Sequence, residues 1–227
     1  MNEKKKVTGL FVAFEGIDGS GKSTQIVEVL RAIQEINKYQ PIVITREPTW
    51  RAEEIRHRLE SERDPMSNSS LLASQFISDR REHYFTDIRP DLARNYVVLC
   101  DRYAMSTLAY QSLPGKMTMF DLVSAHFTSN IGAPDVTFYL SLSAEESARR
   151  IASRNDEREK FEDIDFAHKL VERHEFLYQE SQKESAIGKL LGKIIKIDAT
   201  PQNKIVTSEI LNHLEPLYLS KIQPNNI

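Results

Sequence analysis

The sequence predicts an α/β fold built on a mostly parallel, doubly wound sheet. Five short apolar runs rich in β-branched and aromatic residues recur along the 227 residues, and helical patterns separate them. Continuous apolar runs of this length are typical of strands covered on both faces. Strands that alternate with helices imply right-handed crossovers between parallel neighbours. In such a sheet we expect a ligand to bind beyond the carboxyl ends of the strands.

The elements follow one another without a break that would divide the chain. Strands are expected at LFVAFE (10–15), PIVITRE (41–47), YVVLCD (96–101), DVTFYLSL (135–142) and KIIKID (193–198). Helices are expected at about 21–38, 51–62, 68–94, 118–130, 144–155, 163–187 and 202–216. No repeat or long Gly/Ser linker appears, so residues 1–227 are predicted to form a single domain. The charge-dense segments at about 46–94 and 149–163 are expected to be insertions over the site.

Charge and composition restrict the class of partner. The formal net charge of −3 gives no global field that would hold a nucleic acid polymer, although a local basic patch stays open. A single cysteine excludes an internal disulfide and favours a reducing, cytoplasmic location. The N-terminal lysines precede an apolar run, but Glu15 and Gly16 end it too early for a signal peptide. No run approaches the roughly 20 apolar residues of a membrane span, so no membrane partner is expected.

The first predicted strand leads directly into a phosphate-binding motif. Gly16, Gly21, Lys22 and Ser23 fit G-x-x-x-x-G-K-[ST], between a strand and a helix. Glycines allow positive φ, so that successive N–H groups point at a phosphate on the helix N-terminus. Lys22 is expected to reach the β and γ phosphates of a nucleotide triphosphate, and Thr24 the α phosphate. The predicted ATP site is Gly16, Ile17, Asp18, Gly19, Ser20, Gly21, Lys22, Ser23 and Thr24.

A carboxylate at the end of the third predicted strand supports this site. Asp101 ends the apolar run YVVLCD, where a Walker-B-type acid would approach a metal ion. Taken alone, an acid after a strand is more often a turn residue or a helix cap. With the phosphate motif present, Ser23 and Asp101 are predicted to hold Mg²⁺ together with ATP.

Other motifs narrow the class of nucleotide enzyme. The NKxD signature of GTPases is absent and the chain is too short for a motor, which leaves a small-molecule kinase. The ordered series FEGIDGSGKSTQ, TREPT, FISDRREH, DRYAMSTLAYQ, PDVTFYLSL and IDAT resembles the thymidylate kinases, in a bacterial-like version, over nearly the whole chain. The resemblance implies a P-loop NTPase fold with strand order 2-3-1-4-5 and phosphoryl transfer from ATP to dTMP. It also implies a homodimer packed through helices.

The same resemblance assigns residues to dTMP. Asp18 would bind the 3′-hydroxyl, and Arg46 would face the monophosphate from the end of the second strand. Phe76 would stack on thymine while Arg80, four residues on, donates to a base carbonyl. Arg102 would hold the acceptor phosphate with its guanidinium fork. The structural alternatives are a turn-stiffening Asp18, a core Phe76 and an Arg102 that serves only in an ion pair.

The segment after Arg102 completes the predicted acceptor site. By resemblance, base and sugar lie beside Ser106, Thr107, Tyr110 and Gln111, and Tyr110 would disfavour a ribonucleotide. Cys100 is expected to belong to the core.

Two stretches depart from the family pattern. REPTW places Thr49 and Trp50 where the family has two glycines, beside Glu47, which could pair with Arg46 or belong to the outer shell of the magnesium site. The loop GIDGSGKS also lacks the catalytic arginine that some members carry.

The lid is expected to supply the missing positive charge. ARRIASRNDEREK offers Arg149, Arg150, Arg154, Arg158 and Lys160, of which Arg154 and Arg158 are predicted to neutralise the transferring phosphoryl group. The alternative for such a charge run is a solvated helix face. IDAT is expected to contact adenine through backbone and shape.

Two rival functions stay open at this point. One is a deoxynucleoside kinase, or a kinase for another nucleoside monophosphate, with the same loop and lid. The other is a non-catalytic nucleotide-binding module that kept the loop.

Overall fold

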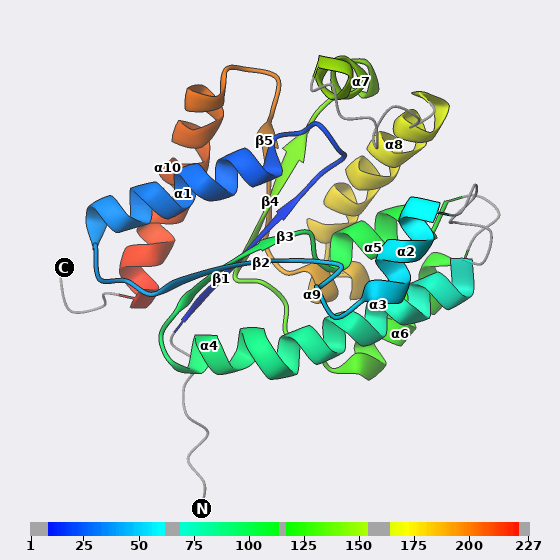
Figure 1. The fold of residues 1–227 in the computed structure, drawn as a ribbon, viewed down its shortest axis with the longest axis horizontal. Coiled ribbons are helices and arrows are strands. Elements are labelled where there is room, and N and C mark those ends of the chain that lie inside the picture. The colour runs from blue at the N-terminus through cyan, green and yellow to red at the C-terminus, as the bar shows by residue number, and fades with distance from the viewer. Residues whose placement is uncertain (1–8, 62–68, 114–116, 154–163, 223–227) are drawn as a thin grey trace, which may run out of the picture.

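The computed structural model describes residues 9–61, 69–113, 117–153 and 164–222, and this part of the chain contains one five-stranded sheet (Figure 1). Its strand order is β2-β3-β1-β4-β5, and every neighbouring pair is parallel. The predicted fold class and the predicted strand order are therefore confirmed. The strands are β1 Leu10–Glu15, β2 Ile42–Arg46, β3 Val97–Asp101, β4 Val136–Ser141 and β5 Ile194–Asp198.

The helices agree with most of the predicted ranges. They are α1 Lys22–Ile36, α2 Glu53–Ser61, α3 Ser69–His83, α4 Arg89–Ala93, α5 Ala104–Gln111, α6 Met119–Ser129, α7 Ala144–Ser153, α8 Ile164–Ser181, α9 Ala186–Leu191 and α10 Asn203–Ile222. Between α3 and α4 the helix continues through a π-helical turn, Tyr84–Ile88. None of the described helices is both long and apolar enough to cross a membrane.

Three helices differ from expectation. The sequence analysis missed α5, a helix of only eight residues, of which six are buried. The helix expected over 163–187 is two helices, since Ser185 caps a new one by accepting from the N–H of Gly188. Finally, α10 does not end near residue 216 but continues through Pro216 to Ile222.

Alternate residues of β1 face two different cores. Leu10, Val12 and Phe14 belong to a cluster shared with α1 and α10, whereas Phe11 and Ala13 belong to one shared with α5, α6 and α9. Figure 1 shows α1 and α10 on one side of the sheet and the long α3–α4 helix on the other. Because both faces are covered, β1 and β3 are buried along their whole length.

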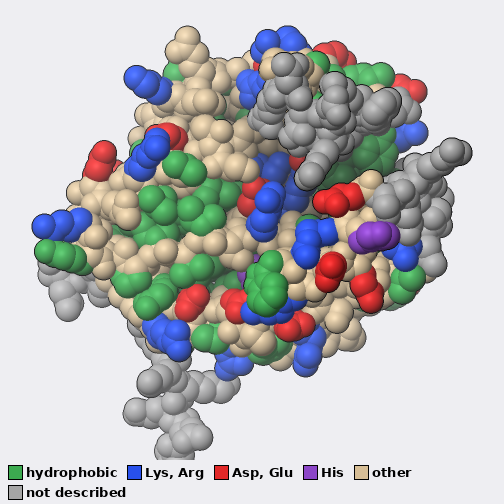
Figure 2. All heavy atoms as spheres, in the orientation of Figure 1, with side chains coloured by type: hydrophobic (Ala, Val, Ile, Leu, Met, Phe, Trp, Pro, Cys, Tyr) green, Lys and Arg blue, Asp and Glu red, His purple; other side chains and the backbone are tan. Residues whose placement is uncertain are grey.

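The register of the central strands brings their carboxyl ends together. Asp101 at the end of β3 lies opposite both Phe14 of β1 and Arg46 of β2. The residues that follow these three strands therefore meet at one edge of the sheet, where a ligand site is expected. Figure 2 shows basic and acidic side chains gathered near the middle of the face of the molecule that it views.

Candidate active site

The phosphate loop has the backbone that its glycines predict. Gly16, Gly19 and Gly21 have φ of 138°, 76° and 92°, a region that favours glycine. A Cβ on Gly16 would also lie 2.6 Å from the carbonyl oxygen of Leu140. Gly21 is the N-cap of α1, whose first turn carries no acidic side chain. The loop thus presents the positive end of a helix to an anion.

Lys22 lies across this loop. Its ammonium nitrogen donates to the carbonyl oxygens of Gly16 and Ile17, both at 3.0 Å, and lies 3.9 Å from Asp18. The side chain is only 7% exposed. Burial, with the nearby Arg102, lowers the pKa of Lys22 from 10.5 to about 8, against the opposing effect of Asp18 and Asp101. A buried cation at the helix terminus is well placed to bind polyphosphate.

The two predicted magnesium ligands are in contact. The Ser23 hydroxyl donates to Oδ2 of Asp101 at 2.9 Å, and Oδ1 of Asp101 is buried without a hydrogen-bond partner among the described residues. A carboxylate and a hydroxyl are the oxygen ligands that Mg²⁺ uses when substrate phosphates supply the rest. These residues fit the ion, although no larger cluster of acids, His or Cys suited to a metal occurs in the described ranges.

Arg102 joins the phosphate loop to α5. Its Nη2 donates to Asp18 at 2.5 Å and to the Tyr110 hydroxyl at 3.4 Å, and its Nη1 donates to Ser106 at 3.0 Å and to the Gly16 carbonyl at 3.3 Å. Burial opposes its charge, but Asp18 and the other acidic groups nearby raise its pKa well above the usual value. The structure therefore brings together four of the residues that the sequence assigned to dTMP.

The backbone of Arg102 is in a conformation that side chains rarely adopt. Its φ is 70°, although it is not glycine, and its N–H is bonded to the Phe14 carbonyl at 2.9 Å. Such conformations cost about 1–3 kcal/mol and cluster at functional sites. Here the strained turn aims the guanidinium at the phosphate loop.

Glu15 is a buried acid that the sequence analysis did not assign to the site. It ends β1 and accepts from the backbone N–H groups of Tyr103 at 2.7 Å and Ser106 at 3.1 Å, and from the Ser106 hydroxyl at 2.5 Å. Burial raises its pKa despite these bonds. Its carboxylate caps the N-terminus of α5 and thereby fixes Ser106 beside Arg102. An acid at the end of an otherwise apolar strand was the available signal.

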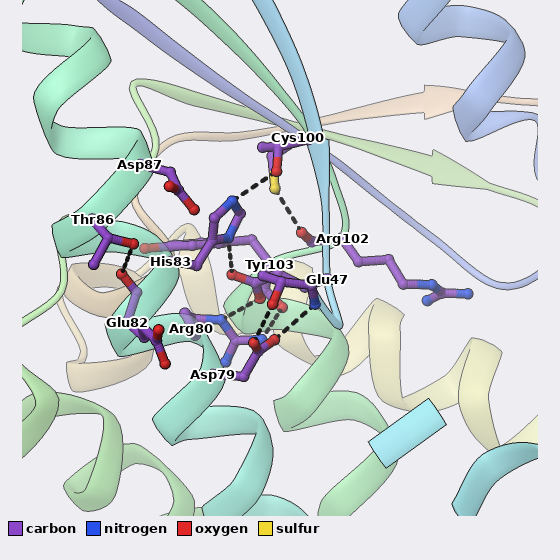
Figure 3. Close-up of polar contacts among 12 residues, drawn as sticks. Glu47, Asp79, Arg80, Glu82, His83, Thr86, Asp87, Cys100, Arg102 and Tyr103 are labelled. Carbon is purple, nitrogen blue, oxygen red and sulfur yellow. Dashed lines mark hydrogen bonds and ion pairs between the residues drawn. The ribbon is translucent and has the colours of Figure 1, made fainter. Parts of the chain in front are cut away.

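A second polar cluster surrounds Arg80, as Figure 3 shows. Its guanidinium is 1% exposed and donates from Nε to Glu47 at 2.7 Å. Nη2 donates to the Tyr103 carbonyl and to the Thr107 hydroxyl, both at 2.9 Å, and Nη1 bonds Nε2 of His126 at 2.8 Å. The guanidinium of Arg102 points away from this cluster (Figure 3). The predicted residues Arg80 and Thr107 are thus in direct contact.

Glu47 does not pair with Arg46, which was one of the two roles that the sequence suggested for it. Its carboxylate binds Arg80 on one oxygen and His83 on the other, at 3.0 Å. Arg46 is exposed and lines an open groove along the edge strand β2 with Trp50, Arg51 and other residues.

Phe76 and Gln111 lie on α3 and α5, the helices that carry Arg80 and Thr107. Phe76 is partly buried and packs against Ile55 and Leu72, in a cluster that Tyr110 also touches. Gln111 is fully buried on α5. This packing is compatible with a stacking role for Phe76 and with a core role.

The loop that departs from the family pattern is held by α3 and α2. Thr49 donates to Asp79 from its backbone N–H at 2.9 Å and from its hydroxyl at 2.5 Å. Arg56 donates to the carbonyls of Thr49 and Trp50. Trp50 is 76% exposed, with the guanidinium of Arg51 over its ring. The two residues that replace glycines are therefore accommodated by specific partners.

Replacing Asp79 tests this loop. If dTMP and ATP are the substrates, as the resemblance implies, we expect Asp79→Ala to raise the KM for dTMP about 3- to 10-fold, because Thr49 loses two bonds of roughly 1 kcal/mol each near Glu47. The KM for ATP should stay within about twofold. Steady-state kinetics with each substrate varied would measure both values. Glu35→Ala, which removes an exposed acid of α1, is the control. An unchanged KM for dTMP in Asp79→Ala would show that the loop does not depend on this contact.

Part of the predicted lid lies outside the described residues, including Arg154, Arg158 and Lys160. Arg149 pairs with Glu146 on an exposed helix face, as its structural alternative implied. Arg150 donates to the carbonyls of Ala199 at 2.8 Å, Thr200 at 3.1 Å and Gly19 at 3.4 Å. It therefore links the phosphate loop to the IDAT segment, a role that the sequence analysis missed.

Comparisons with known proteins agree with this geometry. A family model described as thymidylate kinase matches residues 14–210. A thymidylate kinase from Prochlorococcus marinus (strain NATL1A) is 35% identical, covering 94% of this chain and 99% of that protein. One from Bacillus velezensis is 31% identical, covering 96% and 100%, and one from Ruegeria pomeroyi is 42% identical, covering 69% and 74%. The chain belongs to the thymidylate kinase family.

Proposed function

We propose that this chain transfers the γ-phosphoryl group of ATP to the 5′-phosphate of dTMP, giving dTDP and ADP. The observation that carries the proposal is the position of Arg102, which bonds both Asp18 and the Gly16 carbonyl of the phosphate loop. A guanidinium there would hold an acceptor phosphate directly beside the donor phosphates. Family membership supplies the nucleotide class.

This phosphoryl transfer depends more on the placement of the two substrates than on a general base. A monophosphate has a second pKa near 6 and is already anionic at neutral pH, so no residue must remove a proton from it. Lys22 would exchange the carbonyls of Gly16 and Ile17 for phosphate oxygens, while Arg102 and Asp18 hold the acceptor in line. Catalysis then rests on orientation and on positive charge fixed around the transferring group.

Ser23 and Asp101 would hold Mg²⁺ with the nucleotide. Their contact and the unpartnered Oδ1 of Asp101 support this assignment. When bound, the ion neutralises charge on the phosphate oxygens.

The base would lie between Phe76 and α5. Arg80 and Thr107 would read its polar edge, Gln111 would lie beside it, and Tyr110 would lie beside the sugar. Arg46 would approach the monophosphate from β2 only if its side chain turned from the groove that it lines. Arg154 and Arg158 would enter as the lid at about 149–163 closes and excludes water, the competing acceptor.

An assay across acceptors tests the proposal. With ATP and Mg²⁺ we expect turnover of dTMP to exceed that of dUMP, thymidine and CMP. Preferential turnover of thymidine would favour a deoxynucleoside kinase, and preference for CMP another monophosphate kinase. ATP binding without dTDP formation would favour a non-catalytic module.

The lowered pKa of Lys22 predicts proton uptake on ATP binding. In the free protein its pKa is about 8, and polyphosphate would raise it toward 10.5. We therefore expect uptake of roughly 0.7 proton at pH 8.5 and about 0.1 at pH 7. Calorimetry in buffers of different ionisation enthalpy measures this number. Lys22→Met should abolish the uptake and Lys38→Met should keep it; equal uptake in all three proteins would assign the proton elsewhere.

We also propose a cytoplasmic homodimer that acts on nucleotides and on no nucleic acid polymer. Phe120 and Phe127 support the dimer, because both are exposed aromatic residues seven positions apart on one face of α6. The single cysteine and the net charge of −3 agree with the location and the substrate class.

A further inference from the structure

Arg80 is a buried arginine whose N–H groups all need hydrogen-bond acceptors. A guanidinium has five N–H donors and no acceptor, and a buried donor without a partner costs about 1–3 kcal/mol. Four of the five donors of Arg80 have acceptors: Glu47 for Nε, the Tyr103 carbonyl and Thr107 for Nη2, and His126 for Nη1. Among the described residues the second N–H of Nη1 has none.

His126 is held in the one form that can accept this bond. Its Nδ1 lies 2.7 Å from the Leu122 carbonyl, which only accepts, so Nδ1 carries the proton and Nε2 presents a lone pair to Arg80. Burial, together with Arg80, lowers the pKa of His126 from 6.5 to about 3. The imidazole therefore stays neutral at all physiological pH values.

The acceptors of Arg80 come from three parts of the fold. Glu47 follows β2, Tyr103 and Thr107 lie at α5, and His126 lies on α6. The guanidinium is a planar, rigid fork, so the bonds to Glu47, to the pair at α5 and to His126 fix its plane together. The bond to His126 also occupies one of the two N–H groups of Nη1. Without the imidazole, the guanidinium loses one of its four bonds, and neither N–H group of Nη1 has an acceptor among the described residues.

We propose that His126 is a positioning residue, which helps to hold the guanidinium of Arg80 and occupies one N–H of Nη1, so that the remaining N–H meets the 4-carbonyl of the pyrimidine. The inference rests on the proposed function and deepens it: the donor-only edge of Arg80 selects a carbonyl and rejects a 4-amino group, and His126 keeps that edge in place. Selection of this kind is strong where a buried polar group would otherwise lose its partner.

Variants at position 126 and two acceptors test the proposal. The acceptors are dTMP and 5-methyl-dCMP, which carries an amino group in place of the 4-carbonyl. In His126→Leu we expect the KM for dTMP to rise roughly 5- to 100-fold and the KM for ATP to change less than about twofold. The preference for dTMP over 5-methyl-dCMP, as kcat/KM or as affinity measured by calorimetry, should fall at least about fivefold. His126→Gln should restore much of it, because the Gln oxygen can accept where Nε2 did.

A matched histidine separates positioning from general loss of packing. His174 is also buried, and its Nδ1 also lies near the carbonyl four residues earlier, at 2.8 Å, but its Nε2 has no partner among the described residues. His174→Leu should lower thermal stability without changing the ratio between the two acceptors. If His126→Leu does not fold, His126→Asn replaces it, since the shorter amide can reach Leu122 but not Arg80.

The outcomes distinguish the inference from the proposed function. If the wild-type protein does not phosphorylate dTMP, the proposed function fails and the inference with it. If dTMP is a substrate but the preference is the same in wild type, His126→Leu and His126→Gln, the inference alone is overturned. Nitrogen chemical shifts of the His126 ring give an independent check, because a proton on Nε2 in the free protein would also overturn it.

Discussion

Lys22→Ala is expected to lower kcat by about 10³-fold or more. Lys22 is the only cationic residue between Gly16 and Thr24. Its ammonium is already placed among the loop carbonyls, so its electrostatic contribution to the transferring phosphoryl group requires little rearrangement. A loss of about 4 kcal/mol of transition-state stabilisation corresponds to that factor. Single-turnover kinetics with saturating ATP and dTMP would measure it.

The same lysine destabilises the free protein. Its pKa is about 8 in the fold and 10.5 in the unfolded chain. At pH 7 the charged form therefore lowers the free energy of unfolding by roughly 3 kcal/mol. This destabilisation disappears as the pH rises from 8 toward 10.5. Lys22→Met should therefore raise the Tm at pH 7 and raise it less at pH 10. Lys38→Ala, at the far end of α1, is the control for both measurements. Near-normal kcat in Lys22→Ala would refute the catalytic assignment.

Arg102→Ala is expected to lower kcat/KM for dTMP by about 10³-fold, with a much smaller effect on the KM for ATP. The substitution removes the guanidinium that contacts Asp18, Ser106 and Tyr110, and leaves the carboxylate of Asp18 to repel the acceptor phosphate. Paired charge-assisted hydrogen bonds of this kind are among the strongest in proteins. The change in kcat/KM measures the loss of transition-state stabilisation relative to the free enzyme and the free substrate.

Arg102→Lys separates the effect of the positive charge from that of the guanidinium geometry. A lysine keeps the charge but cannot reproduce the fork that reaches Asp18 and Ser106 together, so we expect it to recover about tenfold at most. Arg94→Ala, which removes an exposed arginine after α4, should leave kcat/KM near the wild-type value. Equal losses for dTMP and ATP in Arg102→Ala would contradict an acceptor-side role.

The parts of the candidate site that the sequence predicted are those marked by a contiguous motif or by the end of a strand. The phosphate loop is one contiguous motif between a strand and a helix, and Asp101 is marked by its place at the end of an apolar strand. Strand order then brings Ser23 and Asp101 together across 78 positions of sequence. For these residues, motif and topology were sufficient.

The partners of Arg80 could not be predicted in this way. His126 lies on α6 and Glu47 follows β2, and the patterns of these segments say nothing of a shared contact. The helix α5 was missed because its eight residues are fewer than pattern recognition needs. The pairing suggested for Arg46 and Glu47 was wrong because consecutive residues of extended chain point to opposite sides. Adjacency in sequence favoured the contact, whereas strand geometry excluded it.

The π turn at Tyr84–Ile88 affects how this chain should be aligned with its relatives. A π turn contains one residue more than an α turn, so the helix after it is rotated by about 100° relative to an uninterrupted one. Arg80 and His83 before the turn face the polar cluster, and Ile88 and Leu92 at its end and beyond face the apolar core. A homologue with a regular helix here would be one residue shorter. The single-residue gap in such an alignment belongs within 84–88, where it preserves the equivalence of both halves of the helix.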